Sequence, residues 1–399
     1  MRASSFSCVK DLWHGREAYK VGNGLVELVT LTGGGHIAEF RFAETSSLPT
    51  LNPLWTPPWK TIDPHRYRAQ DHAVRYGPIT EGKLLSGIAG HSLCMDYFGS
   101  PSPEEAEQGL SQHGEAPNSR WHKVSQTIRR NRVSLTLSLR LPVAGLQFRR
   151  EIALQENLPV AYFKETVTND RKCDHFFHWT EHVTLGPPFI SSQDSAIFIS
   201  GTRGITFPHE YDEGKSLLAP GRRFRWPFAP AKSGEEINLE RVLLRKGLGL
   251  VVSVLIDPRR KWGYVAALNT KWHLLIAYCF RRKDFPWVAV WEENRAISAV
   301  PWSKRTEARG LEFGTTPIPS SRRETLRDGN LFETATTTCI PARGRKTVEY
   351  FAFLAQLPSA VKGIQDIRCG REEIVIYGNT GKSVACISAS PNGSKGRRR

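Results

Sequence analysis

The segment VSLTLSLRL, residues 133–141, alternates apolar and polar side chains without a break. Val133, Leu135, Leu137, Leu139 and Leu141 would share one face of a β-strand, and the three hydroxyl residues between them and Arg140 would share the other. The segment therefore predicts a strand with one face in a hydrophobic core and one face in solvent.

A similar but less regular alternation of apolar and polar residues recurs along most of the chain. Turn-forming stretches such as TGGG, TNDRK, IDPRRK and LNTK separate eight further segments: LVELVTL, AYFKETVT, FFHWTEHVTL, LGLVVSVLI, WHLLIAYCF, WVAVWEE, TVEYFAFLA and EEIVIYG. One short helix is clearly indicated, where Ser102 can cap the N-terminus, Pro103 suits the first position and two glutamates follow. We expect an all-β chain of large antiparallel sheets with few short helices.

The 399 residues are 40% hydrophobic and 24% charged, which is typical of a folded chain. No repeat of about 20 to 50 residues is visible, which disfavours propellers and solenoids. We expect one domain over residues 1–387. Residues 388–399 combine Ser, Pro, Asn and Gly with four basic residues and predict a disordered basic tail.

The net charge of +16 is unusual, and a basic protein attracts phosphates, nucleic acid, anionic lipid surfaces or acidic sugars. Outside the tail, the basic runs at 129–132, 149–150, 221–225 and 281–283 are scattered. Several fall where strands should turn, which favours solvated hairpin ends. The sequence shows no nucleic-acid-binding motif, so no specific nucleic-acid partner is expected.

The seven cysteines are widely spaced and contain no CxxC pair, so they suggest neither a disulfide framework nor a zinc site. The first twenty residues lack the apolar run of a signal peptide. The longest apolar run, LGLVVSVLI at 248–256, is too short to span a bilayer. We therefore expect a cytoplasmic protein that does not associate with membranes.

Three segments carry candidate functional residues, and two of them contain histidines. GLSQHGEAPNSRW at 109–121 places His113 among turn-forming residues. In CDHFFHWTEHVTLGPPF at 173–189, a helix would align three histidines like metal ligands, but the Val, Thr, Phe and Trp content favours a strand. On a strand, His182 shares a face with His178 and Thr180, while His175 and Glu181 point to the other side. This polar row beside Gly-Pro-Pro suggests a pocket and no metal.

The third segment, residues 287–319, contains Glu312 in the stretch GLEFG. Leu311 and Phe313 would partly desolvate the carboxylate, which raises its pKa and suits a general base near neutral pH. The alternative is a surface or salt-bridged glutamate beside Arg309.

Together these segments resemble the galactose mutarotase-like superfamily, the aldose 1-epimerases, and especially the hexose-6-phosphate 1-epimerase branch. SGIAGHSLCMDYFGSPSPEEAEQGLSQHGEA at 86–116 is similar to the glycine-rich strand that leads through Phe-Gly-Pro to Gln-His-Gly. TNDRKCDHFFHWTEHVTLG and AVWEEN…GLEFG place His182 and Glu312 at the positions of the catalytic histidine and glutamate. GGGHIAEFRF at 33–42 resembles the family's glycine-bearing strand pair.

The resemblance implies a β-supersandwich with an open cleft that binds a pyranose and needs no cofactor or metal. Glu312 would take the proton of the anomeric hydroxyl while His182 donates one to the ring oxygen, so that the ring opens and can close as the other anomer. We expect the two groups to lie about the width of a sugar ring apart. His113 and Gln112 would contact the sugar, and Trp121 would stack on it, with Trp55, Trp59 and Trp302 as further aromatic candidates.

The sequence also departs from the family pattern. Glu181 precedes the histidine where the family has Asn or a small polar residue. Glu115 lies where the phosphate branch has an arginine and would repel a phosphate. The arginine that grips the sugar has no clear match in HSLCMDYFG, so His91, Asp96 and Arg75 are candidates for its role. A non-catalytic carbohydrate-binding or sugar-sensing protein on the same fold is the alternative to an isomerase.

Overall fold

Two large antiparallel sheets form the molecule in the computed structural model, which describes residues 6–370 and 372–389. The basic tail expected at 388–399 lies, from residue 390 on, outside the described residues. Helices are few and short, so the expected all-β fold class is confirmed. No helix of the described chain has both the length and the hydropathy that a membrane crossing requires. All seven cysteines are free thiols.

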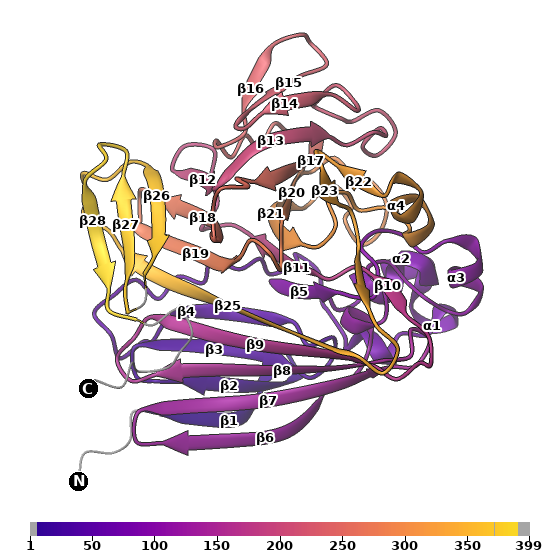
Figure 1. Ribbon diagram of the computed structural model, residues 1–399, viewed down its shortest axis with the longest axis horizontal. Helices are drawn as coiled ribbons and strands as arrows, with labels where there is room; N and C mark the ends of the chain where they lie inside the picture. Colours follow the sequence, from indigo (N-terminus) through magenta and orange to yellow (C-terminus); the bar gives the residue numbers. More distant parts are fainter. Residues whose placement is uncertain (1–5, 371, 390–399) are drawn as a thin grey trace.

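The larger sheet has thirteen strands and carries the N-terminal strands at one edge (Figure 1). In spatial order they are β1 (Ser7–Trp13), β2 (Arg16–Gly22), β3 (Val26–Leu31), β4 (Ile37–Phe42), β5 (His91–Cys94), β11 (Thr180–Leu185), β21 (Glu307–Gly314), β20 (Trp287–Asn294), β17 (Leu248–Ile256), β13 (Gly201–Thr206), β14 (Arg223–Arg225), β15 (Phe228–Pro230) and β16 (Glu236–Asn238). Strands distant in sequence thus meet at its centre, where β5, β11, β21 and β20 are neighbours.

The second sheet has eight strands, and four of its long strands run side by side in the lower half of Figure 1. In spatial order they are β12 (Ser195–Ile199), β18 (Trp262–Asn269), β19 (Leu274–Arg281), β25 (Arg345–Gln356), β9 (Val160–Asn169), β8 (Leu146–Gln155), β7 (Arg132–Leu141) and β6 (His122–Arg129). Strand β7 contains VSLTLSLRL, and its five apolar side chains are all buried, as the alternation predicted.

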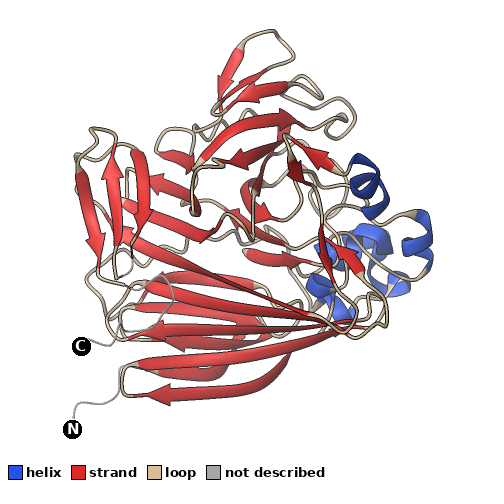
Figure 2. Cartoon of the chain, viewed as in Figure 1, coloured by secondary structure: helices blue, strands red, loops and turns tan. Residues whose placement is uncertain are grey.

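Shorter elements complete the fold. A three-stranded sheet joins β26 (Ile364–Cys369), β27 (Ile374–Gly378) and β28 (Ser383–Ile387), and two-stranded pairs join β10 (His175–Phe177) with β24 (Thr338–Ile340) and β22 (Asn330–Leu331) with β23 (Thr334–Ala335). The helical elements are η1 (Pro64–Arg66), α1 (Ala69–Tyr76), α2 (Ile79–Leu85), α3 (Pro103–Glu107), η2 (Ala116–Asn118) and α4 (Arg322–Asp328). The α-helices gather at one end of the molecule (Figure 2). Helix α3 is the one predicted, with Ser102 and Glu105 forming a capping box.

The segment expected to form one strand over FFHWTEHVTL is broken into β10 and β11. Strand β10 pairs with β24, whereas β11 pairs with β5 and β21. Between them, the N–H of His178 donates to the carbonyl of Asp96, and the N–H of Trp179 donates to Thr315 Oγ1. The backbone groups at the break are therefore bonded to loops rather than to a strand, which ends one ladder and starts the next.

The apolar core between the sheets surrounds one charged cluster. Arg150 donates to Glu165 at 2.5 Å and to Glu181 at 3.0 Å, and Tyr350 donates to both carboxylates. His91 Nε2 lies 2.8 Å from Glu181 Oε2. Each of these side chains is buried, and buried charges are tolerated when they are paired and hydrogen-bonded. Glu181 thus faces the core, away from the side chain of His182, as strand alternation predicted.

Candidate functional site

His182 on β11 and Glu312 on β21 lie directly opposite each other in antiparallel register. His182 Nε2 is 3.3 Å from Glu312 Oε1. Directly opposite residues project from the same face with their Cβ atoms roughly 5 Å apart, so the backbone pairing itself brings the imidazole to the carboxylate. The two side chains are nearly inaccessible, with 6% of His182 and 3% of Glu312 exposed.

The strand residues around this pair are small or carry hydroxyl groups. Ser92 on β5 lies opposite His182 on its other side, and Ala289 on β20 lies opposite Glu312. Gly310 and Gly314 flank Glu312 along β21, two residues away on either side. A Cβ atom added to Gly310 would lie 2.4 Å from Glu312 Oε1. Glycine at this position is therefore needed for the carboxylate to keep its place.

His113 forms a side of the site, with its ring centroid 5.2 Å from that of His182. Its backbone has a positive φ of 65° and is held by hydrogen bonds from its N–H to the carbonyl of Gly99 and from the N–H of Met95 to its own carbonyl. Gly99 N–H also donates to His113 Nδ1 at 3.3 Å. The neutral ring must then carry its proton on Nε2, which makes Nε2 a hydrogen-bond donor.

Burial controls the protonation of all three residues. It raises the pKa of Glu312 well above its usual value and lowers the pKa of His182 to about 4. Burial, together with the nearby His182, lowers the pKa of His113 well below its ordinary value. Desolvation disfavours the charged form of each group, which favours a neutral His113 and a single titratable proton in the His182–Glu312 pair.

Thr184 contacts the other nitrogen of His182. Its hydroxyl lies 3.1 Å from His182 Nδ1 and fixes the orientation of the imidazole toward Glu312. Thr184 follows His182 by two residues on β11 and therefore shares its face. Strand periodicity alone could have identified Thr184, which is not among the predicted site residues.

Several buried polar atoms on this face make no hydrogen bond within the described residues. They include Ser92 Oγ, Thr180 Oγ1 and Glu312 Oε1, and the strand register places all three on the same side of the sheet. Glu312 Oε1 lies 3.3 Å from His182 Nε2 without forming a hydrogen bond to it. Buried polar groups are normally hydrogen-bonded, so these atoms mark positions where a polar ligand would bond.

Aromatic side chains lie next to the pair. The ring of Trp291, on β20, is 6.2 Å from that of His182 and half-buried, and Trp302 lies 6.0 Å beyond it. Trp55 and Trp59, expected near the cleft, are buried in the aromatic cluster behind Trp302. Trp291 is not among the predicted aromatic contacts, although it lies opposite Gly310, two residues from Glu312.

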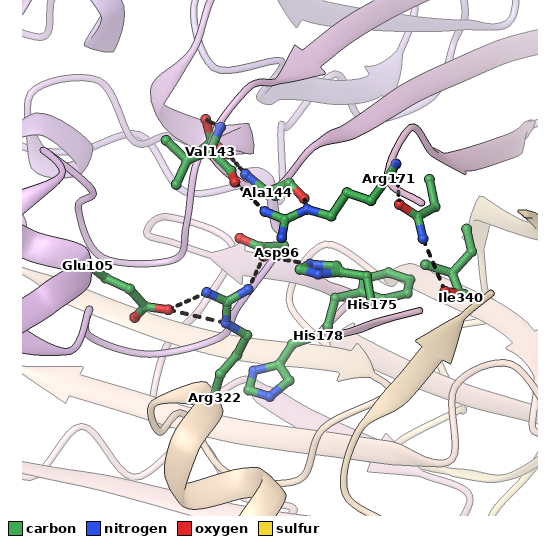
Figure 3. Close-up of polar contacts among 12 residues, drawn as sticks. Asp96, Glu105, Val143, Ala144, Arg171, His175, His178, Arg322 and Ile340 are labelled. Carbon is green, nitrogen blue, oxygen red and sulfur yellow. Dashed lines mark hydrogen bonds and ion pairs between the residues drawn. The ribbon is translucent and has the colours of Figure 1, made fainter. Parts of the chain in front are cut away.

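Asp96 is held in an ion-pair cluster (Figure 3). Its Oδ2 is 3.0 Å from His175 Nε2 and accepts a hydrogen bond from Arg322 Nη1 at 2.6 Å. Arg322, at the start of α4, also donates to Glu105 of α3 at 2.6 Å. Burial alone would raise the pKa of Asp96, but His175 and Arg322 bring it below its usual value. These contacts assign Asp96 to joining β5, α3 and α4 rather than to gripping a sugar.

Gln112 adjoins His113 in the chain, Arg75 lies on α1, and Trp121 lies in the core. Gln112 anchors the His113 loop through its N–H, which donates to the carbonyl of Thr80. Arg75 is exposed on α1 with its guanidinium 5.5 Å from the ring of Tyr76. Trp121 is buried in the core, where its Nε1 donates to the carbonyl of Ala116. A residue enclosed by core contacts cannot present its ring to a sugar, so the predicted stacking role of Trp121 is wrong.

His91 and Glu115 are both held by structural contacts. His91 faces the core network with Glu181 and cannot take the place of a sugar-gripping arginine. The carboxylate of Glu115 accepts hydrogen bonds from the N–H groups of Val143 and Ala144, at 3.2 and 2.8 Å, and so holds the turn between β7 and β8. These bonds give Glu115 a structural role in this turn.

No family model matches the sequence, and no curated protein matches it. Solved structures do match. A proposed aldose 1-epimerase from Klebsiella pneumoniae subsp. pneumoniae MGH 78578 superposes with a TM-score of 0.62 at 11% identity, covering 89% of this chain and 84% of that chain. A galactose mutarotase-like protein from Clostridium acetobutylicum gives 0.53 at 12% identity, covering 89% and 100%. A proposed aldose 1-epimerase from Escherichia coli K12 gives 0.54 at 14%, covering 85% and 99%.

The protein therefore has a galactose mutarotase-like fold, the fold that aldose 1-epimerases and mutarotases share. The superpositions establish the fold, and at 11–14% identity they do not select a branch of the superfamily. No group of three or more His, Cys, Asp or Glu side chains in residues 6–370 and 372–389 is arranged to hold a metal ion.

Proposed function

We propose that this protein is an aldose 1-epimerase that interconverts the α and β anomers of a hexose by general acid/base catalysis. The observation that carries the proposal is the buried His182–Glu312 pair, 3.3 Å apart on adjacent strands with His113 beside it. The mutarotase-like fold supports a sugar as the ligand.

The spacing of the pair suits the chemistry, although it is shorter than the width of a sugar ring. The anomeric hydroxyl and the ring oxygen are bonded to the same carbon, so one acid and one base must reach two neighbouring oxygens. Two groups approaching this carbon from one side can be close together. The expected separation of a ring width was therefore too large.

The number of protons held by the pair suits ring opening. One proton shared by His182 and Glu312 leaves one acid and one base in the site. The form of the pair that reacts in this proposal has the proton on His182 and an ionised Glu312. His182 Nε2 gives its proton to the ring oxygen while Glu312 accepts the proton of the anomeric hydroxyl. The C1–ring-oxygen bond breaks, the carbonyl forms at C1, and rotation about C1–C2 followed by closure with reversed roles gives the other anomer. The site returns to its starting protonation.

The surrounding polar atoms supply sugar contacts. His113 Nε2 is a donor, and Ser92 Oγ and Thr180 Oγ1 can each donate and accept. Trp291 offers a half-buried ring beside His182 for the apolar face of a pyranose.

Anomer exchange measured by NMR across free and phosphorylated hexoses tests the proposal. We expect exchange above the buffer rate for at least one sugar, and its loss in His182→Ala. Glu156→Gln, an exposed carboxylate in the β8–β9 turn, should leave the rate unchanged. Exchange at the buffer rate for every sugar would overturn the proposal, and sugar binding without exchange would identify a carbohydrate-binding protein instead.

A further inference from the structure

The outer face of the eight-stranded sheet carries an organised set of cations. In the register of β7, β8, β9 and β25, one cross-strand row is Arg140, Gln147, Thr168 and Arg345, the next is Ser138, Arg149, Thr166 and Thr347, and the third is Thr136, Glu151, Lys164 and Glu349. Arg140, Arg149 and Lys164 therefore follow one oblique line across three adjacent strands. Diagonal neighbours of this kind lie roughly 7–8 Å apart.

These cations face solvent because their strand neighbours face the core. Phe148 and Arg150, on either side of Arg149, are buried. Arg140, Arg149, Lys164 and Arg345 are exposed, and none of them forms an ion pair with any described residue. We call these four residues and the hydroxyl residues between them the basic face.

The basic face is hollowed. A cavity of about 1160 Å³ is lined by all four cations and by Arg120, and a second of about 290 Å³ adjoins it through Arg149 and Glu151. The second cavity adds Arg129 and Arg132, so seven cationic side chains line the two cavities. Glu151 is their only carboxylate within the described residues, and Arg132 neutralises it at 2.8 Å. Such a surface attracts an extended anion.

The residue types that line the two cavities indicate which class of polyanion would bind. Single-stranded nucleic acids are bound largely by stacking bases on aromatic rings. The only Phe, Tyr or Trp that lines the two cavities within the described chain is Phe148, which is 1% exposed. Hydroxyl side chains are abundant instead, and they suit the hydroxyl groups of sugars: Ser119, Ser125, Thr127, Ser134, Thr136, Ser138, Thr166 and Thr168.

We propose that the basic face binds an anionic polysaccharide, a chain of sugars that bears carboxylate or sulfate groups. Arg140, Arg149 and Lys164 bind successive anionic groups, and the hydroxyl residues between them bond to the sugar hydroxyls. The basic face lies on the eight-stranded sheet, whereas the His182–Glu312 pair lies on the thirteen-stranded sheet. Binding at the basic face does not depend on catalysis by the pair.

Binding of the full chain to polygalacturonate and heparin, with neutral dextran and an oligothymidylate for comparison, tests the proposal. The triple variant Arg140→Gln/Arg149→Gln/Lys164→Gln should bind at least tenfold more weakly and show a shallower salt dependence. The control Arg222→Gln/Arg225→Gln/Lys246→Gln removes the same charge from exposed positions elsewhere and should bind within about twofold of wild type.

Equal weakening of the two triple variants would attribute binding to net charge and overturn the proposal. Undiminished binding by the Arg140/Arg149/Lys164 variant, no binding of either anionic polysaccharide, or tighter binding of the oligothymidylate would also overturn it. Circular dichroism and thermal unfolding of both variants confirm that each is folded.

Discussion

Because His182 and Glu312 are buried, the protonation of this pair should determine the rate of the proposed reaction. The pKa of His182 is lowered to about 4, so a second proton enters the pair only as the pH falls through that value. Both groups are then protonated, so the pair no longer contains a base. At high pH the shared proton leaves instead, and the acid is lost at a pH set by the raised pKa of Glu312.

We therefore predict a bell-shaped dependence of kcat/KM on pH with an acid limb near pH 4. The exchange rate measured from acid to alkaline pH checks this. An acid limb near the ordinary histidine pKa of about 6.5 would show that His182 is not desolvated as described.

His113 should act in binding rather than in proton transfer, because its neutral ring offers Nε2 as a donor. His113→Gln is predicted to raise KM about tenfold, the value of one good hydrogen bond, with a much smaller change in kcat. Steady-state exchange kinetics measure both. The control His122→Gln, at an exposed position of β6, should change neither. A loss confined to kcat would instead give His113 a part in the proton transfer.

Glu165 in the core network should make stability depend on pH. Burial raises its pKa from 4.5 to about 8, against the opposing effect of Arg150. The folded state then binds the proton more tightly than the unfolded state, so the stability contributed by protonated Glu165 is lost as pH rises from 4.5 through about 8. Glu165→Gln should flatten this part of the pH dependence. Urea unfolding at a series of pH values measures it, and identical slopes for both proteins would contradict the prediction.

The pairing of β11 with β21 is what assembles the proposed catalytic pair. The same pairing leaves no room for a side chain at Gly310, where a Cβ atom would meet Glu312 Oε1 at 2.4 Å. Gly310→Ala is therefore predicted to lower kcat at least tenfold by displacing the carboxylate. Gly363→Ala, where the nearest atom is 3.6 Å away, is the matched control. Unchanged activity in Gly310→Ala, with an unfolding midpoint like that of wild type, would contradict the predicted displacement of the carboxylate.

Strands were predictable from sequence where a core face repeats every second residue, as in β7. The break between β10 and β11 was not predictable, because it depends on bonds from His178 and Trp179 to loops distant in sequence. Helix α1 was also missed, since it buries only Tyr76 and so shows no apolar stripe. Helix α4 did carry a readable signal, a capping box formed by Ser321 and Glu324.

The proposed site was predictable only in part. His182 and Glu312 follow from motifs that resemble a known family, and strand periodicity correctly placed Glu181 on the opposite face. The environment of Trp121 could not be foreseen, because it depends on Gly35, where a Cβ atom would come within 2.2 Å of the indole ring. The same holds for Asp96, whose partner Arg322 lies far along the chain.

The two proposals assign different partners to the two sheets. The thirteen-stranded sheet holds a buried, nearly neutral acid/base pair, which suits a small sugar. The eight-stranded sheet presents exposed cations, which suit an extended anion. Part of the high net charge of the chain is thus gathered on the basic face. From the sequence, the basic residues were expected at scattered hairpin ends instead.

The most direct test of the catalytic assignment compares wild type with Glu312→Gln on one sugar that wild type turns over, with binding and anomer exchange measured by NMR in the same samples. The substitution keeps the size of the side chain and removes the base. We predict that binding stays within about threefold of wild type while exchange falls at least a hundredfold, as expected for loss of a general base. Exchange by Glu312→Gln at the wild-type rate would contradict the account.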